Sequence, residues 1–480
     1  MGADTSLLDR WLPVRRFAVP RWMIEQATAL RAAGDWRGAC AVANIEVDVD
    51  LAAIGRDHGT GIAEAVEDDL RHLAPDLLRW HLDRDPSLWL SLRREPTLLS
   101  VHPGGHLLVV PRYRGTPGLR LVLRFAGPAD PRRGLHTNRE QWDVRCTGDL
   151  LARQQPSPDT AEILALQDAG QWREAWRLAG FDIDALTDPP PMLEERLRTT
   201  RFDLTTLAAA AREFGRPEAM IDLEGEHLWI DGFRHRIHLG YDDRRDIPPV
   251  LPMARVERSI DADLVRLGLL SLDELHPLVA AAMVPGHKGA AGPAPRVDMS
   301  PFTVPCGSER HRIGPDGIPH PPEEIRREQS LLALGGPTPT GCFAAHLGWR
   351  NPVLPLPKVL RRRRSVLVEQ ARSGDGPALT AWLDAGLDPH LRTIEGWTLL
   401  HLIAWLPDPA ALVTRLVAAG LDLEAQFRGG PTPLRHAIVQ GGSVAAIRAL
   451  AAAGAVTTGW AEAAERANRL AELQFLATPC

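Results

Sequence analysis

The hydrophobic pattern near the start of the chain is helical and comes in two pieces. Between Trp22 and Ala43, apolar residues recur mostly three or four positions apart, which is the spacing that places side chains on one face of a helix. Gly34 interrupts this pattern and Trp36 resumes it. The segment therefore predicts two helices joined by a tight turn.

A second pattern indicates a β-hairpin further along. The segments 227–230 and 233–239 are separated by Asp231-Gly232, and an Asp-Gly pair in such a place favours a turn whose central residues both have positive φ. Earlier in the chain, the segments 107–111 and 119–125 are predicted to form the corresponding pair of strands around Gly115 and Gly118.

The predicted helical hairpin has a similar segment later in the chain. Residues 29–48 match residues 165–184 at nine of twenty positions, including Trp36 and Trp172. Further on, His106 and the leucine after it match His227 and its leucine at a shorter offset, as loop deletions would produce. We interpret this as a duplicated module that contains a helical hairpin, further helices and then a small β element.

A repeated tetrapeptide indicates a partial third β element. Arg-His-Arg-Ile occurs at 234–237 and again at 310–313, and Cys306 stands before the second copy where Asp231 stands before the first. Residues 285–305 are rich in proline, glycine and alanine, and therefore predict a linker.

A regular period marks the last quarter of the chain. Gly386, Gly420 and Gly454 lie 34 residues apart, and each follows an alanine. The segment 396–401 is likewise followed 34 residues later by the similar segment 430–435. A period of this length predicts stacked repeats, each of which needs a neighbour to cover its apolar face.

The repeated motif resembles the ankyrin repeat, whose signature has Thr-Pro-Leu-His at the start of its first helix. Here Thr398 begins Thr-Leu-Leu-His, and Thr432 begins Thr-Pro-Leu-Arg. The resemblance implies a turn and two antiparallel helices in each repeat, with a capping unit before the two full copies and a closing helix from Trp460. The whole arrangement is similar to ankyrin-repeat proteins of GC-rich bacteria.

The same resemblance implies that the chain binds another protein. Ankyrin arrays usually bind through their turn tips and concave helical surface. The positions that correspond here are Arg392, Trp397, Trp405, Phe427 and Arg428. Aromatic and arginine side chains are frequent interface anchors. For Trp397 and Trp405, the alternative is packing between repeats or against the preceding domain.

The predicted fold class is α+β, mainly helical: duplicated modules of a helical hairpin and a β-hairpin, followed by a short C-terminal ankyrin solenoid. We expect the first module at 1–150 and the second at 151–284. Residues 285–357 would hold the linker and the partial third β element with a helix. The ankyrin repeats and their caps would occupy 358–480.

Composition narrows the classes of function. A net charge of −6 argues against a dedicated nucleic-acid binder. The five cysteines are scattered without a Cys-x-x-Cys pair, which favours a reducing, cytoplasmic location. No run of 18 apolar residues occurs, so we expect no membrane span. Lys288 and Lys358 are the only lysines, a bias typical of GC-rich bacterial genomes.

Candidate chemistry is sparse, and we predict no catalytic residue, no metal site and no cofactor. Pro103 and the two glycines after it prevent His102 and His106 from chelating a metal on one helix. On a strand, His235 and His238 would point to opposite faces.

Two further groups of polar residues suggest chemistry. Cys306, with His311 and His320 nearby in sequence, could form a thiol–imidazole pair, but its position matches the turn residue Asp231. The two arginines of the repeated Arg-His-Arg could bind a phosphate or an acidic strip of a partner. A solvated sheet face is favoured over this binding site.

The sequence thus predicts a non-enzymatic interaction protein. The alternative is an enzyme or ligand-binding body targeted by the ankyrin tail, whose active groups would come from His106, His227, His235, Cys306 and His311. A third hypothesis, nucleic-acid contact through the arginines at 361–364, is not favoured, since a solvated helix start explains them.

Overall fold

The protein is described here from a computed structural model. The structure describes residues 6–82, 84, 92, 95–111, 120–127, 135–152, 159–212, 218–223, 225–239, 250, 251, 253–315, 317–467 and 469–477. Helices hold 49% of the described residues and strands 14%. The prediction of a mainly helical α+β protein is therefore confirmed at this level.

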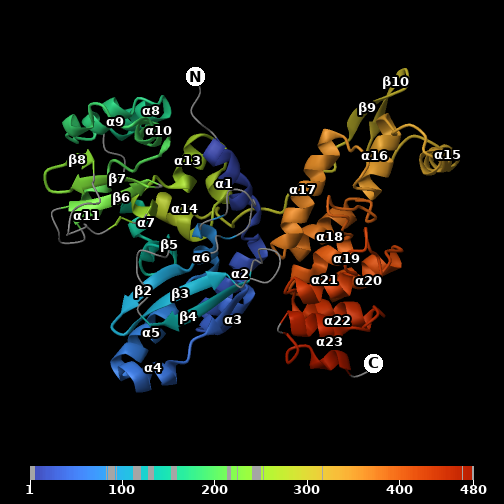
Figure 1. The fold of residues 1–480 in the computed structure, drawn as a ribbon, viewed down its shortest axis with the longest axis horizontal. Coiled ribbons are helices and arrows are strands. Elements are labelled where there is room, and N and C mark those ends of the chain that lie inside the picture. Colours follow the sequence, from blue (N-terminus) through green and yellow to red (C-terminus); the bar gives the residue numbers. More distant parts are fainter. Residues whose placement is uncertain are drawn as a thin grey trace. The chain divides into compact units, whose positions relative to one another are not determined.

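The chain divides into two compact units (Figure 1). Unit 1 consists of Met1–Val19, Met23–Pro111 and Arg120–Pro293, and unit 2 contains Ala294–Cys480 together with Pro20–Trp22. The division falls inside the segment predicted to be a linker. Among the described residues, no helix has the length and apolar content needed to cross a membrane.

The first half of unit 1 packs helices with a five-stranded sheet. The helices are α1 (Ser6–Phe17), α2 (Arg21–Ala32), α3 (Trp36–Val42), α4 (Leu51–His58), α5 (Thr60–His72), α6 (Pro75–His81), the 3-10 helix η2 (Arg139–Gln141) and α7 (Asp149–Ala152). The strands are β1 (Ile45–Asp48), β2 (Thr97–His102), β3 (Gly105–Pro111), β4 (Leu121–Ala126) and β5 (Leu135–His136).

The sheet has the order β1-β4-β3-β2-β5, with an antiparallel meander β2-β3-β4 and parallel strands at both edges. Its central strand β3 is buried along almost its whole length. The pattern predicted β3 and most of β4 but missed β2. The predicted turn around Gly115 and Gly118 lies outside the described residues.

The second half of unit 1 also combines helices with a sheet, which has three strands. Its helices are α8 (Thr160–Asp168), α9 (Trp172–Leu178), η3 (Asp184–Leu186), α10 (Pro191–Thr199), α11 (Leu207–Arg212), α12 (Met253–Val256), α13 (Ile260–Arg266), η4 (Leu272–Glu274) and α14 (Pro277–Met283). The strands β6 (Glu218–Leu223), β7 (Glu226–Asp231) and β8 (Arg236–Leu239) form an antiparallel meander.

The turn between β7 and β8 differs from the predicted two-residue Asp-Gly turn. Four residues, 232–235, separate the strands, and the residue with positive φ is His235, at 51°. The Asp231 carboxylate accepts hydrogen bonds from the backbone N–H groups of Phe233 and Arg234, both at 2.9 Å. This acceptor stabilises the wider turn, as Asp side chains do in Asx turns.

Unit 2 begins with a small β-hairpin and continues as helices. Its elements are β9 (Phe302–Cys306), β10 (Glu309–Ile313), α15 (Pro322–Ala333), α16 (Gly341–Arg350), α17 (Lys358–Arg372), α18 (Gly376–Asp384), α19 (Leu399–Leu402), η5 (Ile403–Trp405), α20 (Ala410–Ala418), α21 (Pro433–Val439), α22 (Val444–Ala452), α23 (Trp460–Arg466) and η6 (Gln474–Ala477).

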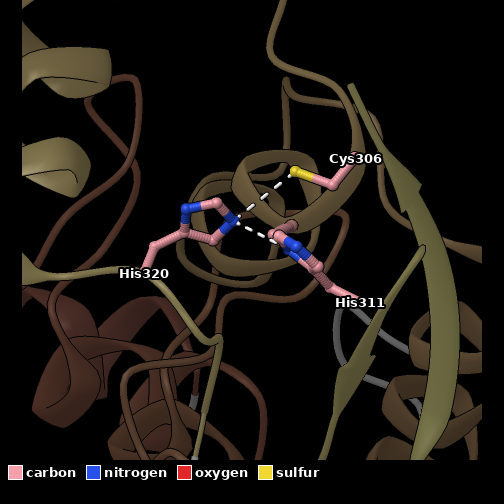
Figure 2. Close-up of side chains that lie close together, drawn as sticks. Cys306, His311 and His320 are labelled. Carbon is pink, nitrogen blue, oxygen red and sulfur yellow. Dashed lines mark hydrogen bonds between the residues drawn. The ribbon is translucent and has the colours of Figure 1, made fainter. Parts of the chain in front are cut away.

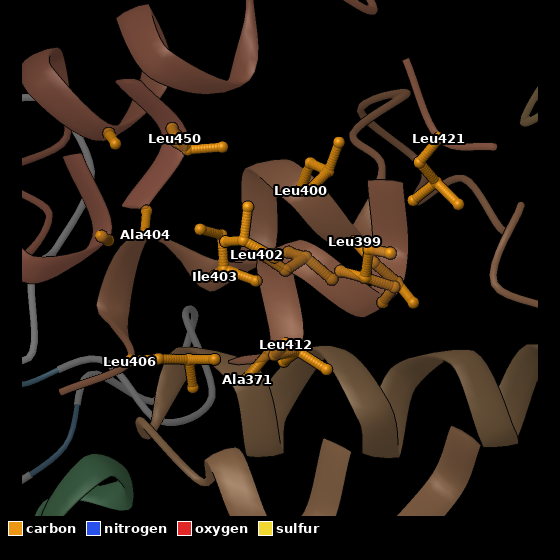
Figure 3. Close-up of a cluster of buried hydrophobic side chains, with 14 of the residues drawn as sticks. Ala371, Leu399, Leu400, Leu402, Ile403, Ala404, Leu406, Leu412, Leu421 and Leu450 are labelled. Atoms are coloured by element: carbon orange, nitrogen blue, oxygen red, sulfur yellow. The ribbon is translucent and has the colours of Figure 1, made fainter. Parts of the chain in front are cut away.

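From α17 onward the helices of unit 2 pack in pairs that stack in chain order (Figure 1). α17 packs on α18, α19 on α20, and α21 on α22, while α19 lies between α17 and α21. One continuous apolar core runs through the stack, and Figure 3 shows Leu400, Ile403 and Leu412 within it. We call residues 358–477 the helical array.

Local signals explain where these helices begin and end. The hydroxyl of Ser443 accepts the backbone N–H of Ala446, and the carboxylate of Asp375 accepts that of Ala378; both are N-caps. After α18, α20 and α22, glycines at φ of 87° to 100° end the helices in the left-handed conformation. These glycines are the ones whose 34-residue spacing revealed the period.

The arginine run in α17 is only partly solvated, contrary to the predicted solvated helix start. Arg363 and Arg364 are buried, and burial lowers the pKa of both guanidinium groups. The Arg364 side chain donates to the carbonyl oxygen of Arg392 at 3.2 Å. Arg363 donates to the carbonyl oxygen of Ser300 and lies over the ring of Phe302. Arg364 therefore joins two parts of the array and Arg363 ties residues 300–302 to it, and neither side chain contributes to a basic surface.

Candidate functional sites

The five residues predicted to bind a partner lie on two consecutive turn segments of the helical array and on the helix between them. In the first turn, the Arg392 side chain donates to the carbonyl oxygen of Gly396 at 2.8 Å. The backbone N–H of Thr393 donates to the carbonyl oxygen of Trp397 at 2.9 Å. These bonds close a tight loop whose tip presents Ile394, with 75% of its surface exposed.

The two tryptophans come together around a buried histidine. The ring centroid of His436 lies 4.4 Å from that of Trp397 and 5.6 Å from that of Trp405. Both tryptophans remain half-buried, and the Arg372 guanidinium lies 5.8 Å from the centre of the Trp397 ring. The rings therefore pack within the array on one side and reach solvent on the other, so both predicted roles are compatible with their positions.

Phe427 and Arg428 form the second tip. The Arg428 guanidinium lies 5.2 Å from the centre of the Phe427 ring, and Arg428 is exposed. Phe427 lies against Gly396 so closely that a Cβ at Gly396, where φ is 87°, would meet the ring at 2.2 Å. Glycine at that position thus lets the two tips touch. We call Arg392, Ile394, Trp397, Trp405, Phe427 and Arg428 the tip surface.

A histidine of the repeat motif joins successive repeats. The backbone N–H of Thr398 donates to His401 Nδ1 at 3.1 Å, so the proton of the neutral ring is on Nε2. That nitrogen donates to the carbonyl oxygen of Pro431 at 3.1 Å. Burial lowers the pKa of His401 to about 4, so the ring stays neutral.

A separate cluster of two cysteines and two histidines lies in the hairpin region of unit 2. It contains Cys306 at the end of β9, His311 in β10, His320 before α15, and Cys342 in the first turn of α16. One ligand atom from each lies within 4.8 Å of every other. Figure 2 shows three of these side chains converging. We call these residues the Cys2His2 cluster.

The inward-facing atoms of the cluster are close. His311 Nδ1 lies 3.2 Å from His320 Nε2, which in turn lies 3.5 Å from Cys306 Sγ (Figure 2). Cys342 Sγ lies 3.5 Å from His311 Nδ1. Cys342 is buried, and burial, with a hydrogen bond to Cys306, raises the pKa of its thiol to about 12.

The outward-facing nitrogen of each ring contacts a carboxylate. His311 Nε2 lies 3.1 Å from Glu309 Oε2, and His320 Nδ1 lies 2.8 Å from Glu324 Oε2. Glu309 is exposed and Glu324 is half-buried, whereas the histidine side chains are only 21% and 12% exposed. Each ring is therefore oriented by its own acidic partner.

Glycines position two parts of the cluster. Gly307, at φ of 63°, makes the tight turn after Cys306. Gly341, at φ of 57°, begins α16 so close to β9 that a Cβ there would lie 2.4 Å from the carbonyl oxygen of Pro305. That close approach brings Cys342 to Cys306. The sequence pattern indicated Cys306, His311 and His320 but not Cys342, because no local pattern links Cys342 to the hairpin.

The other candidate histidines do not join a shared site. His106 is in β3 of the five-stranded sheet, His227 is in β7 of the three-stranded sheet, and His235 stacks on Phe181 at 5.5 Å. His102 Nε2 lies 3.0 Å from the carboxylate of Asp69. Of the set proposed for an enzyme, only Cys306 and His311 come together.

Unit 1 also contains a cleft of about 350 Å³ between α4 and the end of β4. Asp48, Asp57, His58 and Arg124 contribute to its lining. The Arg124 guanidinium donates to the Asp48 carboxylate at 2.9 Å. None of the candidate catalytic side chains named from the sequence is among its lining residues.

Comparisons with known proteins do not assign this chain to a family. No family model, curated protein or solved structure matches it.

Proposed function

We propose that this chain is a cytoplasmic, non-enzymatic interaction protein that binds a partner protein through an ankyrin-type array at its C-terminal end. What supports the proposal is the tip surface. Its aromatic side chains are half-buried, so they are held in place by the array while part of each ring is left for a partner. Rigid aromatic anchors lose little conformational entropy on binding, which is why they dominate interface energies.

The character of the tip surface suggests the chemistry of the partner. Ile394 and Arg428 are exposed at the two tips, and Arg435 is exposed at the start of α21. A partner segment that presents an apolar side chain beside one or more carboxylates would satisfy both. Double-stranded nucleic acid is a poorer fit, because the denser run at 361–364 has two of its four arginines buried.

Duplication of the module in unit 1 is part of the same proposal. Arg37 lies over Trp36 and Arg173 lies over Trp172, each at 4.3 Å from the ring centre. The matched residues His106 and His227 each occupy the second position of the central strand of a meander. These shared details support descent of the two halves from one module, with the array added as the binding device.

The test is capture of partners by the full-length chain from the cells that produce it. The paired substitution Phe427→Ala with Arg428→Ala should lower the amount of a specific partner by about tenfold or more, as expected when one interface anchor is lost. The captured proteins would be quantified by mass spectrometry.

The array offers a matched control. Arg448 lies over the ring of Phe475 at 4.6 Å, away from the two tips. The pair Arg448→Ala and Phe475→Ala removes the same chemistry and should leave partner capture unchanged. Equal capture by wild type and both double variants would reject the tip surface as the binding site.

A further inference from the structure

We propose that Cys306, His311, His320 and Cys342 bind one Zn²⁺ ion in a closed, tetrahedral structural site. The inference is independent of partner binding by the tip surface. It was not predicted from the sequence, which indicated no metal.

The spacing of the four ligand atoms fits a tetrahedral zinc ion. With Zn–N of about 2.0–2.1 Å and Zn–S of about 2.3 Å, tetrahedral angles place two nitrogens about 3.3 Å apart and a nitrogen and a sulfur about 3.6 Å apart. The corresponding contacts here are 3.2 Å between the two nitrogens, and 3.5 Å both from Cys306 Sγ to His320 Nε2 and from Cys342 Sγ to His311 Nδ1. Three edges of the tetrahedron are thus formed by side chains from four separate segments.

The protonation of the rings leads to the same conclusion. A carboxylate can only accept a hydrogen bond, so Glu309 and Glu324 hold the proton of each neutral ring on its outward nitrogen. The inward nitrogens, His311 Nδ1 and His320 Nε2, then present two lone pairs to each other at 3.2 Å. Two acceptors cannot bond to each other, but both can bind a cation placed between them.

The two glutamates also match the usual surroundings of zinc-bound histidine. A ligating imidazole generally donates its other N–H to a carboxylate or carbonyl, which fixes the tautomer and raises the basicity of the ligating nitrogen. Both rings of the cluster have such a partner, on opposite ring nitrogens. The use of Nδ1 by one ring and Nε2 by the other follows from where each glutamate lies.

The ligand set selects the metal and the kind of site. Two thiolates with two imidazoles in tetrahedral geometry suit zinc, whereas Mg²⁺ and Ca²⁺ prefer oxygen ligands. Four protein ligands leave no position for water or substrate, so the site stabilises structure. Two thiolates also neutralise the charge of the ion, which suits the partial burial of the cluster.

The fold around the cluster needs such a cross-link. Among the residues that the structure describes, its core contains four buried ones, Val304, Ile313, Cys342 and Ala345. None of the described residues of α15 is buried, although that helix has twelve residues. Regions with so little buried apolar surface generally require a metal or a disulfide to stay folded, and the cysteines here are free.

The site would fasten the start of the helical array. Metal binding ties the β9–β10 hairpin to α16, and the end of α16 holds the first turn of the array. Trp349 Nε1 donates to the carbonyl oxygen of Asp388 at 3.0 Å, and Trp349 accepts the backbone N–H of Arg392 at 2.9 Å. Loss of the metal should therefore loosen both the hairpin and the end of the stack beside it.

The decisive experiment measures metal in the full-length wild-type protein and then replaces it. Elemental analysis after purification should find about one zinc per chain. After removal of zinc under reducing conditions, Co²⁺ should bind with the same stoichiometry and give the intense visible absorption of a tetrahedral thiolate complex, which Zn²⁺ should then abolish. Apoprotein that binds neither Co²⁺ nor Zn²⁺ at micromolar concentration would overturn the proposal.

Matched variants locate the site. Cys342→Ser and His320→Ala should each lower the zinc content to below about a tenth of the wild-type value. Cys146→Ser and His235→Ala remove a cysteine and a histidine of unit 1 and should keep full zinc content. Stoichiometric zinc in both cluster variants would overturn the assignment. Should a cluster variant fail to fold, the Co²⁺ spectrum of the wild type still decides, because it reports thiolate ligands directly.

Discussion

The same tetrapeptide, Arg-His-Arg-Ile, occurs in two hairpins of this protein and takes a different place in each. In unit 1, four residues separate β7 and β8, and His235 lies in the turn and stacks on Phe181. In unit 2, only two residues separate β9 and β10, and His311 lies in the strand opposite Val304. The register, and not the tetrapeptide, decides what the histidine can reach.

The residue before each turn accounts for much of the difference. Asp231 accepts two backbone N–H groups and so stabilises the wider turn. The Cys306 side chain is a much weaker hydrogen-bond acceptor than a carboxylate. In this hairpin Gly307, at φ of 63°, makes the tighter turn. His311 then faces His320 and Cys342, which have no counterparts near His235 among the residues that the structure describes. Four predictions follow from this comparison, beginning with the largest effect.

The largest expected difference between the two hairpins is in how much their buried isoleucines contribute to the free energy of unfolding. Ile237 is fully buried in a large core, so Ile237→Ala should lower the free energy of unfolding of unit 1 by about 2 to 5 kcal/mol. Ile313 belongs to the four-residue core, and Ile313→Ala should cost less. Urea unfolding of the full chain measures both, with the exposed Ile394→Ala as a control expected to stay within about 0.5 kcal/mol. Equal losses at 237 and 313 would break the comparison.

A third histidine extends the contrast, because His436 is buried with no hydrogen-bond partner on either ring nitrogen among the described residues. Burial, with smaller effects from His401 and Arg372, lowers its pKa to about 3. An unfolded histidine titrates near 6.5. As the pH falls below that value the unfolded chain gains a proton that the folded chain does not, so folding stability is lost down to about pH 3.

The variant His436→Phe should remove this loss. Between pH 6.5 and 4.5 the wild type should lose roughly 2 to 3 kcal/mol more than the variant in the unfolding of unit 2. The wild-type curve alone is not sufficient, because burial raises the pKa of Asp375 to about 6. Protonation of Asp375 therefore stabilises the folded chain as the pH falls over part of the same range. Parallel curves for the two proteins would contradict the prediction.

The turn of the first hairpin gives a smaller effect. Asp231→Ala removes the acceptor of two backbone hydrogen bonds and should lower the stability of unit 1 by about 1 kcal/mol. Asp231→Asn keeps an oxygen acceptor and should cost less than half as much. Thermal unfolding of the three proteins measures the difference. Equal midpoints for wild type and Asp231→Ala would show that the carboxylate does not stabilise the turn.

The smallest expected effect is that of a substitution that tests whether the hairpin sequence is enough to bind a metal. Asp231→Cys makes the first hairpin resemble the second in sequence, yet it should add no metal binding, because the described part of the chain places no further pair of ligands beside His235. Co²⁺ titration should give the same stoichiometry as the wild type. A second equivalent of tetrahedral Co²⁺ would mean that the hairpin sequence alone makes the site.

Structural features that depend on short stretches of sequence were predicted well. The glycines at 34-residue spacing do end helices, and Leu400, Ile403 and Leu412, which lie in the repeated segments between them, are buried in the array core. The helical break at Gly34 is also present, with α2 and α3 on either side. Each of these depends on residues within a turn or two of one another, so the chain itself carries the information.

Predictions that depended on register or distant packing fared less well. Strand β2 was missed, and the β7–β8 turn was assigned two residues where it has four. Arg363 and Arg364 were predicted to lie in solvent at the start of a helix, but residues 298–302 and the first turn of the array cover them. For the two arginines, the deciding contacts come from segments 63 and 28 residues away in the chain.

The sequence by itself determined the mainly helical character, the period of the C-terminal region and the chemical types available to a site. The tertiary structure alone decided which of 17 histidines and five cysteines meet. Cys342 lies 31 residues beyond His311, yet their ligand atoms are 3.5 Å apart. That convergence depends on a two-residue turn and on a glycine that lets α16 approach β9, and neither has a periodic signal that could announce it.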